Sequence, residues 1–174
     1  MNKTLYLLCG IPNSGKTTWV KNQQAHLDNS IHISRDEIRF SLLKDNNDYF
    51  AKEDLVFNTF INKINESIKS TDKEIIFVDA THLNEAARNK VLDKLNLSSI
   101  SVVPVNFNLS VDTCVYRNSF RSERAKVPDN VIKNMFNKYN PANYGEKHNY
   151  TYILNINEDN DYRISIDKGV DKNE

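Results

Sequence analysis

The chain has 174 residues, 23 basic and 23 acidic side chains, and two cysteines. This length favours a single domain, and the neutral charge excludes a polybasic nucleic-acid-binding protein, although not a local basic patch. Two cysteines exclude a disulfide framework and a four-thiolate zinc site, and the apolar runs are far shorter than the ~20 residues of a membrane span. We therefore expect a cytoplasmic protein.

The first predicted elements are a buried strand over residues 5–9, a loop, and a helix over 17–27. The loop reads GIPNSGKT and matches G-x-x-x-x-G-K-[ST], the phosphate-binding loop (P-loop). Its backbone N–H groups and the helix N-terminus can surround an anion. The pattern predicts that ATP and Mg²⁺ bind here, with Lys16 at the β- and γ-phosphates and Thr17 on the metal. The other expected nucleotide contacts are Gly10, Asn13, Ser14, Gly15 and Thr18.

The rest of the chain alternates strands and helices. Strands are predicted at 31–34, 74–79, 100–108, 150–156 and 162–166, and helices at 35–43, 49–68, 84–95, 111–120 and 128–139. This alternation predicts the α/β class, as a three-layer P-loop NTPase fold with a mainly parallel sheet. Pro104 favours an edge position or a bulge for its strand, because proline has no N–H. We expect one domain over 1–167, with a helical lid at about 111–139 and a polar tail at 168–174.

The second strand leads into Asp36 and Arg39, which are three residues apart and share one face of the following helix. Ligands of open α/β sheets bind beyond the carboxyl ends of the strands, so Asp36 is expected to face the P-loop. There it can accept the proton of an attacking hydroxyl, while Arg39 holds an anionic group of the acceptor. The alternative is that Asp36 only caps the helix and Arg39 is a solvated charge.

The third strand ends in Asp79, and apolar residues that lead into an aspartate are typical of a second Mg²⁺-binding element in P-loop enzymes. A turn-initiating aspartate is the alternative. Further along, residues 117–128 carry several basic side chains and one acidic residue. Arginines at such a position can stabilise the charge on a transferred phosphoryl group from a lid, although a basic run is also typical of a solvated helix face.

Four segments together resemble the 5′-hydroxyl polynucleotide kinases, including the kinase domain of the bacteriophage polynucleotide kinase-phosphatase. They are the P-loop followed by Thr18 and Trp19, the RDEIR run at 35–39, the VDATHLN run at 78–84, and the lid from Arg117 through Arg121 to Val127 and Pro128. The similarity spans roughly residues 3–139. The P-loop itself is generic, whereas the Arg-Asp-x-x-Arg and Arg-Asn-x-x-Arg elements are more specific in combination.

The resemblance implies roles for these residues. Asp36 would be the general base for a 5′-hydroxyl, Arg39 would bind the phosphate beside the acceptor nucleoside, and Arg121 would contact the γ-phosphate. Arg117 would help hold the nucleotide, and Asp79 would support the metal site. The lid is one residue longer than the family pattern between Arg121 and Val127, so Arg124 is a second candidate for the lid arginine.

The predicted function is therefore an ATP-dependent kinase of 5′-OH polynucleotide ends, in RNA or DNA. The chain holds no Asp-x-Asp-Gly-Thr phosphatase motif, so we expect kinase activity only. One alternative is a P-loop kinase of a nucleoside, sugar or nucleotide sugar. Another is a non-catalytic nucleotide switch, which the Asp36–Arg39 pair disfavours because a switch has no acceptor to deprotonate.

Overall fold

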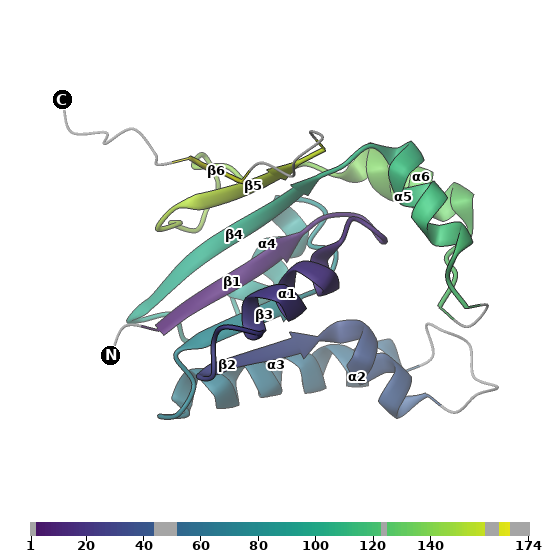
Figure 1. Ribbon diagram of the computed structural model, residues 1–174. Coiled ribbons are helices and arrows are strands. Elements are labelled where there is room, and N and C mark those ends of the chain that lie inside the picture. The colour runs from purple at the N-terminus through teal and green to yellow at the C-terminus, as the bar shows by residue number, and fades with distance from the viewer. Residues whose placement is uncertain (1–2, 44–51, 123–124, 159–163, 168–174) are drawn as a thin grey trace.

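The computed structural model describes residues 3–43, 52–122, 125–158 and 164–167. A six-stranded sheet in the order β2-β3-β1-β4-β5-β6 forms the centre of the molecule (Figure 1). The first five strands in this order are parallel, and β6 is antiparallel to β5. The strands are β1 (Lys3–Cys9), β2 (Ser30–Ser34), β3 (Ile75–Asp79), β4 (Ile100–Asn108), β5 (Ile153–Asn157) and β6 (Ile164–Asp167).

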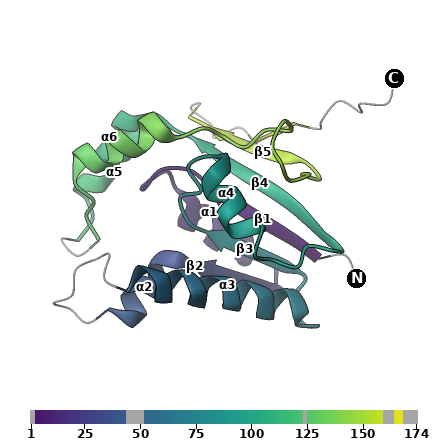
Figure 2. The ribbon, with the colours of Figure 1, turned by 180° about the vertical axis from the view of Figure 1, so that it is seen from behind.

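Helices cover both faces of this sheet, as Figures 1 and 2 show from opposite sides. The described helices are α1 (Lys16–Gln24), α2 (Arg35–Leu42), α3 (Glu53–Lys69), α4 (Glu85–Leu92), α5 (Val111–Ser119) and α6 (Asp129–Lys138). Successive residues of β1 point to opposite faces. Leu7 packs in a core with α3 and α4, while Leu8 packs in a second core with α1, α5 and α6. This confirms the predicted three-layer α/β fold.

The fourth strand differs from the sequence prediction. Pro104 favoured an edge strand or a bulge, but β4 lies between β1 and β5 with an unbroken register. The carbonyl of Val102 accepts from the N–H of Thr151 on the β5 side. Backbone groups of a strand alternate between its two neighbours, so the backbone nitrogen of Pro104, two residues further on, also faces β5. The ladder with β5 begins only at Val105. The missing N–H of Pro104 therefore costs no hydrogen bond to β5, and the prediction was wrong.

The strand order brings three loops to one end of the sheet. β3 lies between β1 and β2, with Leu8 and Ser34 both in register with Asp79. Because these strands are parallel, their carboxyl ends meet. Helix α2 and the α5–α6 pair lie at this same end in both ribbon views. No helix in the described part of the chain is long and apolar enough to cross a membrane.

Candidate functional site

The P-loop curls back over the end of β1 as its glycines predict. A Cβ on Gly10 would lie 2.7 Å from Ser14 Oγ and 2.9 Å from Phe107 Cβ, so a larger residue does not fit there. Gly15 has φ of 96°, in the left-handed region that favours glycine. Ser14 is buried inside the loop, whereas Thr18 is exposed on α1. The loop therefore has the open backbone cradle that a phosphate requires.

Lys16 is buried in the cradle. Its Nζ donates to the carbonyl oxygens of Gly10 and Ile11, at 2.9 Å each. Burial lowers the pKa of this ammonium, and the negative charges of Asp79 and Asp36 act in the opposite direction. A buried cation among backbone carbonyls attracts an anion, which fits the predicted contact of Lys16 with phosphate.

Thr17 and Asp79 meet at the metal position that the sequence predicts. Thr17 Oγ1 donates to Asp79 Oδ2 at 2.9 Å, and His32 Nε2 lies 3.1 Å from the same oxygen. Burial raises the pKa of Asp79, but contacts with His32, Lys16 and Thr17 outweigh burial and hold the pKa below its usual value. Sequence reasoning missed His32, because only the pairing of β2 with β3 brings it to Asp79.

These oxygens fit Mg²⁺. Magnesium prefers hard oxygen ligands and is commonly held by one or two protein groups together with nucleotide phosphates. Within residues 3–43, 52–122, 125–158 and 164–167, no cluster of three or more His, Cys, Asp or Glu side chains could hold a metal. An ion beside Thr17 and Asp79 would therefore also need oxygens from the nucleotide.

Asp36 does not cap its helix. The cap of α2 is Ser34, whose Oγ accepts from the N–H of Glu37 at 3.3 Å. Asp36 instead accepts from Arg39, with 2.6 Å between Oδ1 and Nη1. The Asp36 side chain is 63% exposed, whereas that of Arg39 is 6% exposed and also pairs with Glu53 at 2.8 Å. The solvated-charge alternative for Arg39 therefore does not hold.

The predicted lid begins on α5. Arg117 Nη1 donates to the backbone oxygen of Asn13 in the P-loop at 3.4 Å. Asn118, which is fully buried, accepts from Asn13 Nδ2 at 3.1 Å. Arg121 is exposed, and its Nη1 donates to the carbonyl oxygen of Ala125 at 3.1 Å. Arg124 lies outside the described residues, so the choice between the two lid arginines stays a prediction.

The loop after β3 is hydrogen-bonded to the end of β1 and to the first residue of the P-loop. The N–H of Gly10 donates to the Thr81 carbonyl at 2.9 Å, and His82 Nδ1 donates to the Leu8 carbonyl at 2.7 Å. His82 is buried with φ of 41°. The buried Arg88 pairs with Glu146 at 2.5 Å. Both side chains therefore lie in the protein interior, and Arg88 is paired with a buried carboxylate.

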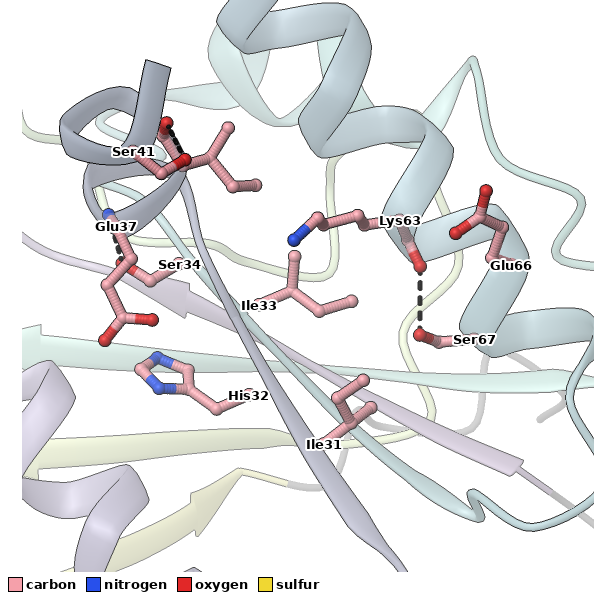
Figure 3. A pocket seen from close by; sticks show the side chains of 10 residues that line it. Ile31, His32, Ile33, Ser34, Glu37, Ser41, Lys63, Glu66 and Ser67 are labelled. Carbon is pink, nitrogen blue, oxygen red and sulfur yellow. Dashed lines mark hydrogen bonds between the residues drawn. The ribbon is translucent and has the colours of Figure 1, made fainter. Parts of the chain in front are cut away.

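A cavity of about 470 Å³ lies along the edge strand β2, between α2 and α3 (Figure 3). His32 and Glu37 lie near one another at one end, and Glu66 and Ser67 lie at the other. No P-loop residue lines this cavity. His32 is shared between the cavity and the Asp79 cluster. The cavity is therefore next to the metal position but separate from the phosphate cradle.

Comparison with known proteins agrees with this geometry. The model of the AAA domain family matches residues 5–142. The chain belongs to this family. An L-seryl-tRNA(Sec) kinase of Methanococcus maripaludis is 26% identical over 94% of this chain and 70% of that protein. A protein of Autographa californica nuclear polyhedrosis virus, described as a bifunctional polynucleotide kinase/RNA ligase, is 25% identical over 89% of this chain. This chain spans only 23% of the viral protein's length.

The fold is also that of solved P-loop kinases. The crystal structure of a fungal RNA kinase superimposes with a TM-score of 0.64 at 14% identity, covering 91% of this chain and 76% of that one. Together with the family match over residues 5–142 and the viral relative, this confirms the resemblance to the P-loop kinases, and the chain is a nucleotide-binding P-loop kinase.

Proposed function

We propose that this protein transfers the γ-phosphate of ATP to the 5′-hydroxyl end of RNA or DNA, and that it acts in the cytoplasm. The observation that carries the proposal is the exposed carboxylate of Asp36, held by Arg39 at the same end of the sheet as the P-loop. The similarity to the viral polynucleotide kinase/RNA ligase and to the fungal RNA kinase supports a polynucleotide acceptor.

In this proposal, the P-loop N–H groups and Lys16 hold the β- and γ-phosphates of ATP. Asp36 takes the proton of the 5′-hydroxyl while the oxygen of that hydroxyl attacks the γ-phosphorus. A bond forms between these two atoms, the bond to the β,γ-bridging oxygen breaks, and ADP leaves. Mg²⁺, held by Thr17 and Asp79 with the nucleotide, would neutralise charge on the phosphates. The binding of an acceptor phosphate by Arg39 stays a prediction.

The lid completes the proposed site. Arg117 contacts the P-loop and is assigned to the nucleotide. Arg121 or Arg124 is assigned to the charge that spreads over the γ-phosphate oxygens in the transition state. If Arg124→Ala reduces kcat more than Arg121→Ala does, Arg124 is the lid arginine.

The decisive experiment incubates the protein with γ-labelled ATP, Mg²⁺ and 5′-OH oligonucleotides of RNA and of DNA. We expect label on the oligonucleotide. Asp36→Ala should reduce transfer at least ~10²-fold while ATP still binds, because a positioned general base typically contributes 10²–10⁴-fold. Lys16→Ala should abolish both ATP binding and transfer. Asp54→Ala, which removes an exposed carboxylate on α3, is the matched control and should leave transfer unchanged.

The similarity to L-seryl-tRNA(Sec) kinase supports a second candidate, a kinase of a hydroxyl acceptor other than a polynucleotide end. The same assay separates the two when seryl-tRNA, nucleosides and sugars are offered in parallel. Label on one of these acceptors and none on the oligonucleotides would refute the polynucleotide proposal. ATP binding without transfer to any acceptor would favour the nucleotide switch.

A further inference from the structure

Glu53, the first residue of α3, holds two arginines of α2. Its Oε2 accepts from Arg39 Nη2 at 2.8 Å, and its Oε1 accepts from Arg35 Nη2. Burial raises the pKa of Glu53, but hydrogen bonds and charge from Arg39 and Arg35 outweigh burial and keep the pKa low. Glu53 is therefore a carboxylate near neutral pH, with one oxygen assigned to each arginine.

Arg39 lies between the two carboxylates and is the most buried of the three charged groups. Arg39, which is nearly buried, uses Nη2 for Glu53 and Nη1 for Asp36 Oδ1. A guanidinium is planar and rigid, so fixing one nitrogen restricts the direction of the other. The position of Glu53 thus limits where Arg39 can hold the Asp36 carboxylate.

Arg35, the second partner of Glu53, contacts the core. The guanidinium carbon of Arg35 lies 5.4 Å from the centre of the buried Phe57 ring, one turn along α3 from Glu53. Helices α2 and α3 lie against each other in both ribbon views. The contact with Arg35 therefore holds the Glu53 side chain in a defined position between helices α2 and α3.

We propose that Glu53 is a positioning residue that acts through Arg39 to orient the Asp36 carboxylate for proton transfer. This inference rests on the proposed role of Asp36 as the general base. Misplacing a catalytic group by about 1 Å can cost ~10²-fold in rate. The effect belongs on kcat, because Glu53 points at Arg39 and Arg35 and not at the P-loop.

The test is a double-mutant cycle on kcat, measured with the 5′-OH oligonucleotide as acceptor. Glu53→Ala should lower kcat by roughly 10- to 100-fold, with the KM for ATP and for the acceptor within about twofold of wild type. Glu53→Gln keeps an oxygen for Arg39 and should lose less. Because Glu53 acts through Arg39, the double variant with Arg39→Ala should be no slower than Arg39→Ala alone. Asp54→Ala is the matched control.

Thermal unfolding and ATP binding identify variants that lose activity through misfolding. If Glu53→Ala misfolds, the kcat of Glu53→Gln tests the proposal, because glutamine has nearly the same shape as glutamate. The inference is overturned if both Glu53 variants keep wild-type kcat, if they change only the acceptor KM, or if the losses multiply in the double variant. These outcomes require that the wild-type protein labels the oligonucleotide. Absence of that label contradicts the proposed function instead.

Discussion

Asp79 joins three segments of the chain through a single oxygen. Its Oδ2 accepts from Thr17 and lies within hydrogen-bond distance of His32. His82, three residues further along the chain, differs from Asp79 because its ring is buried in the neutral form. Burial lowers the pKa of His82 to about 4, although its hydrogen bond to Leu8 acts in the opposite direction. Protonation of the buried His82 ring is therefore expected to affect the stability of the fold.

His82 should make the protein less stable in mild acid. The unfolded state binds a proton near pH 6.5, whereas the folded state does so only near pH 4. The contribution of the neutral His82 ring to the free energy of unfolding is thus complete above about pH 6.5 and is lost as the pH falls toward 4. Between pH 7 and 5, we expect the loss to be about 2 kcal/mol.

The measurement compares urea unfolding of the wild type and His82→Asn at pH 7 and pH 5. Asparagine tolerates the positive φ of this position and does not titrate. The other histidines contribute equally to both proteins, so the variant should lose about 2 kcal/mol less than the wild type over this range. Equal losses would show that His82 does not titrate as its burial predicts.

Helices α5 and α6 are held to the P-loop by one buried amide. Asn118 accepts from Asn13 Nδ2 and from the Val127 N–H, and it donates to the Val127 carbonyl at 2.6 Å and to Asp129 Oδ1 at 3.2 Å. One side chain thus joins the P-loop, the end of α5 and the start of α6. The position of the α5–α6 pair depends on this contact as well as on the apolar packing of Ile132 and Cys114.

Asn118→Ala should destabilise the fold by about 1–3 kcal/mol, because it leaves the half-buried N–H and carbonyl groups of Val127 without partners. For a chain of this size, we expect Tm to fall by several degrees. The nucleotide affinity should also fall, since the side chain of Asn13 loses its hydrogen bond to Asn118. Differential scanning calorimetry and ATP titration measure the two effects. Ser119→Ala, on the exposed face of the same helix, is the control. Equal Tm values for the two variants would rule out this role for Asn118.

A buried ion pair connects α4 to the segment that precedes β5. Arg88 on α4 donates to both oxygens of Glu146, in the segment that precedes β5, and to the carbonyls of His82 and Asn140. Tyr150 also donates to Glu146 at 2.8 Å. The arginine side chain is 0% exposed and the glutamate 2%. The segment after α6 is therefore held to α4, in the core that also contains α3.

Removing one partner should destabilise the whole molecule. Arg88→Met leaves a buried carboxylate without its cation, and we expect a loss of about 3–5 kcal/mol. The double variant Arg88→Met, Glu146→Leu should recover part of this loss, because no buried charge remains. Lys147→Ala breaks the exposed pair with Asp93, and should destabilise the protein far less, because solvent screens an exposed ion pair. Chemical denaturation compares the three, and equal losses for Arg88→Met and Lys147→Ala would contradict the assignment.

Several features could be predicted because they depend on neighbouring residues. The GIPNSGKT run predicted the P-loop, the spacing of apolar residues predicted most strands and helices, and their alternation predicted the parallel α/β sheet. The three-residue spacing of Asp36 and Arg39 placed them on one helix face, and the structure pairs them. Periodicity did not predict the sheet position of Pro104, since edge or centre depends on which strands pair.

By itself, the sequence determined the phosphate cradle, the class of fold and the residues that follow each strand. Only the tertiary structure decided that His32 lies at Asp79, that Asn118 joins helix α5 to Asn13, and that Glu53 holds Arg39. These partners are 47, 105 and 14 residues apart. Local patterns record hydrogen-bond geometry within a turn, strand or helix, whereas distant contacts follow from the strand order and from the helices packed on the sheet.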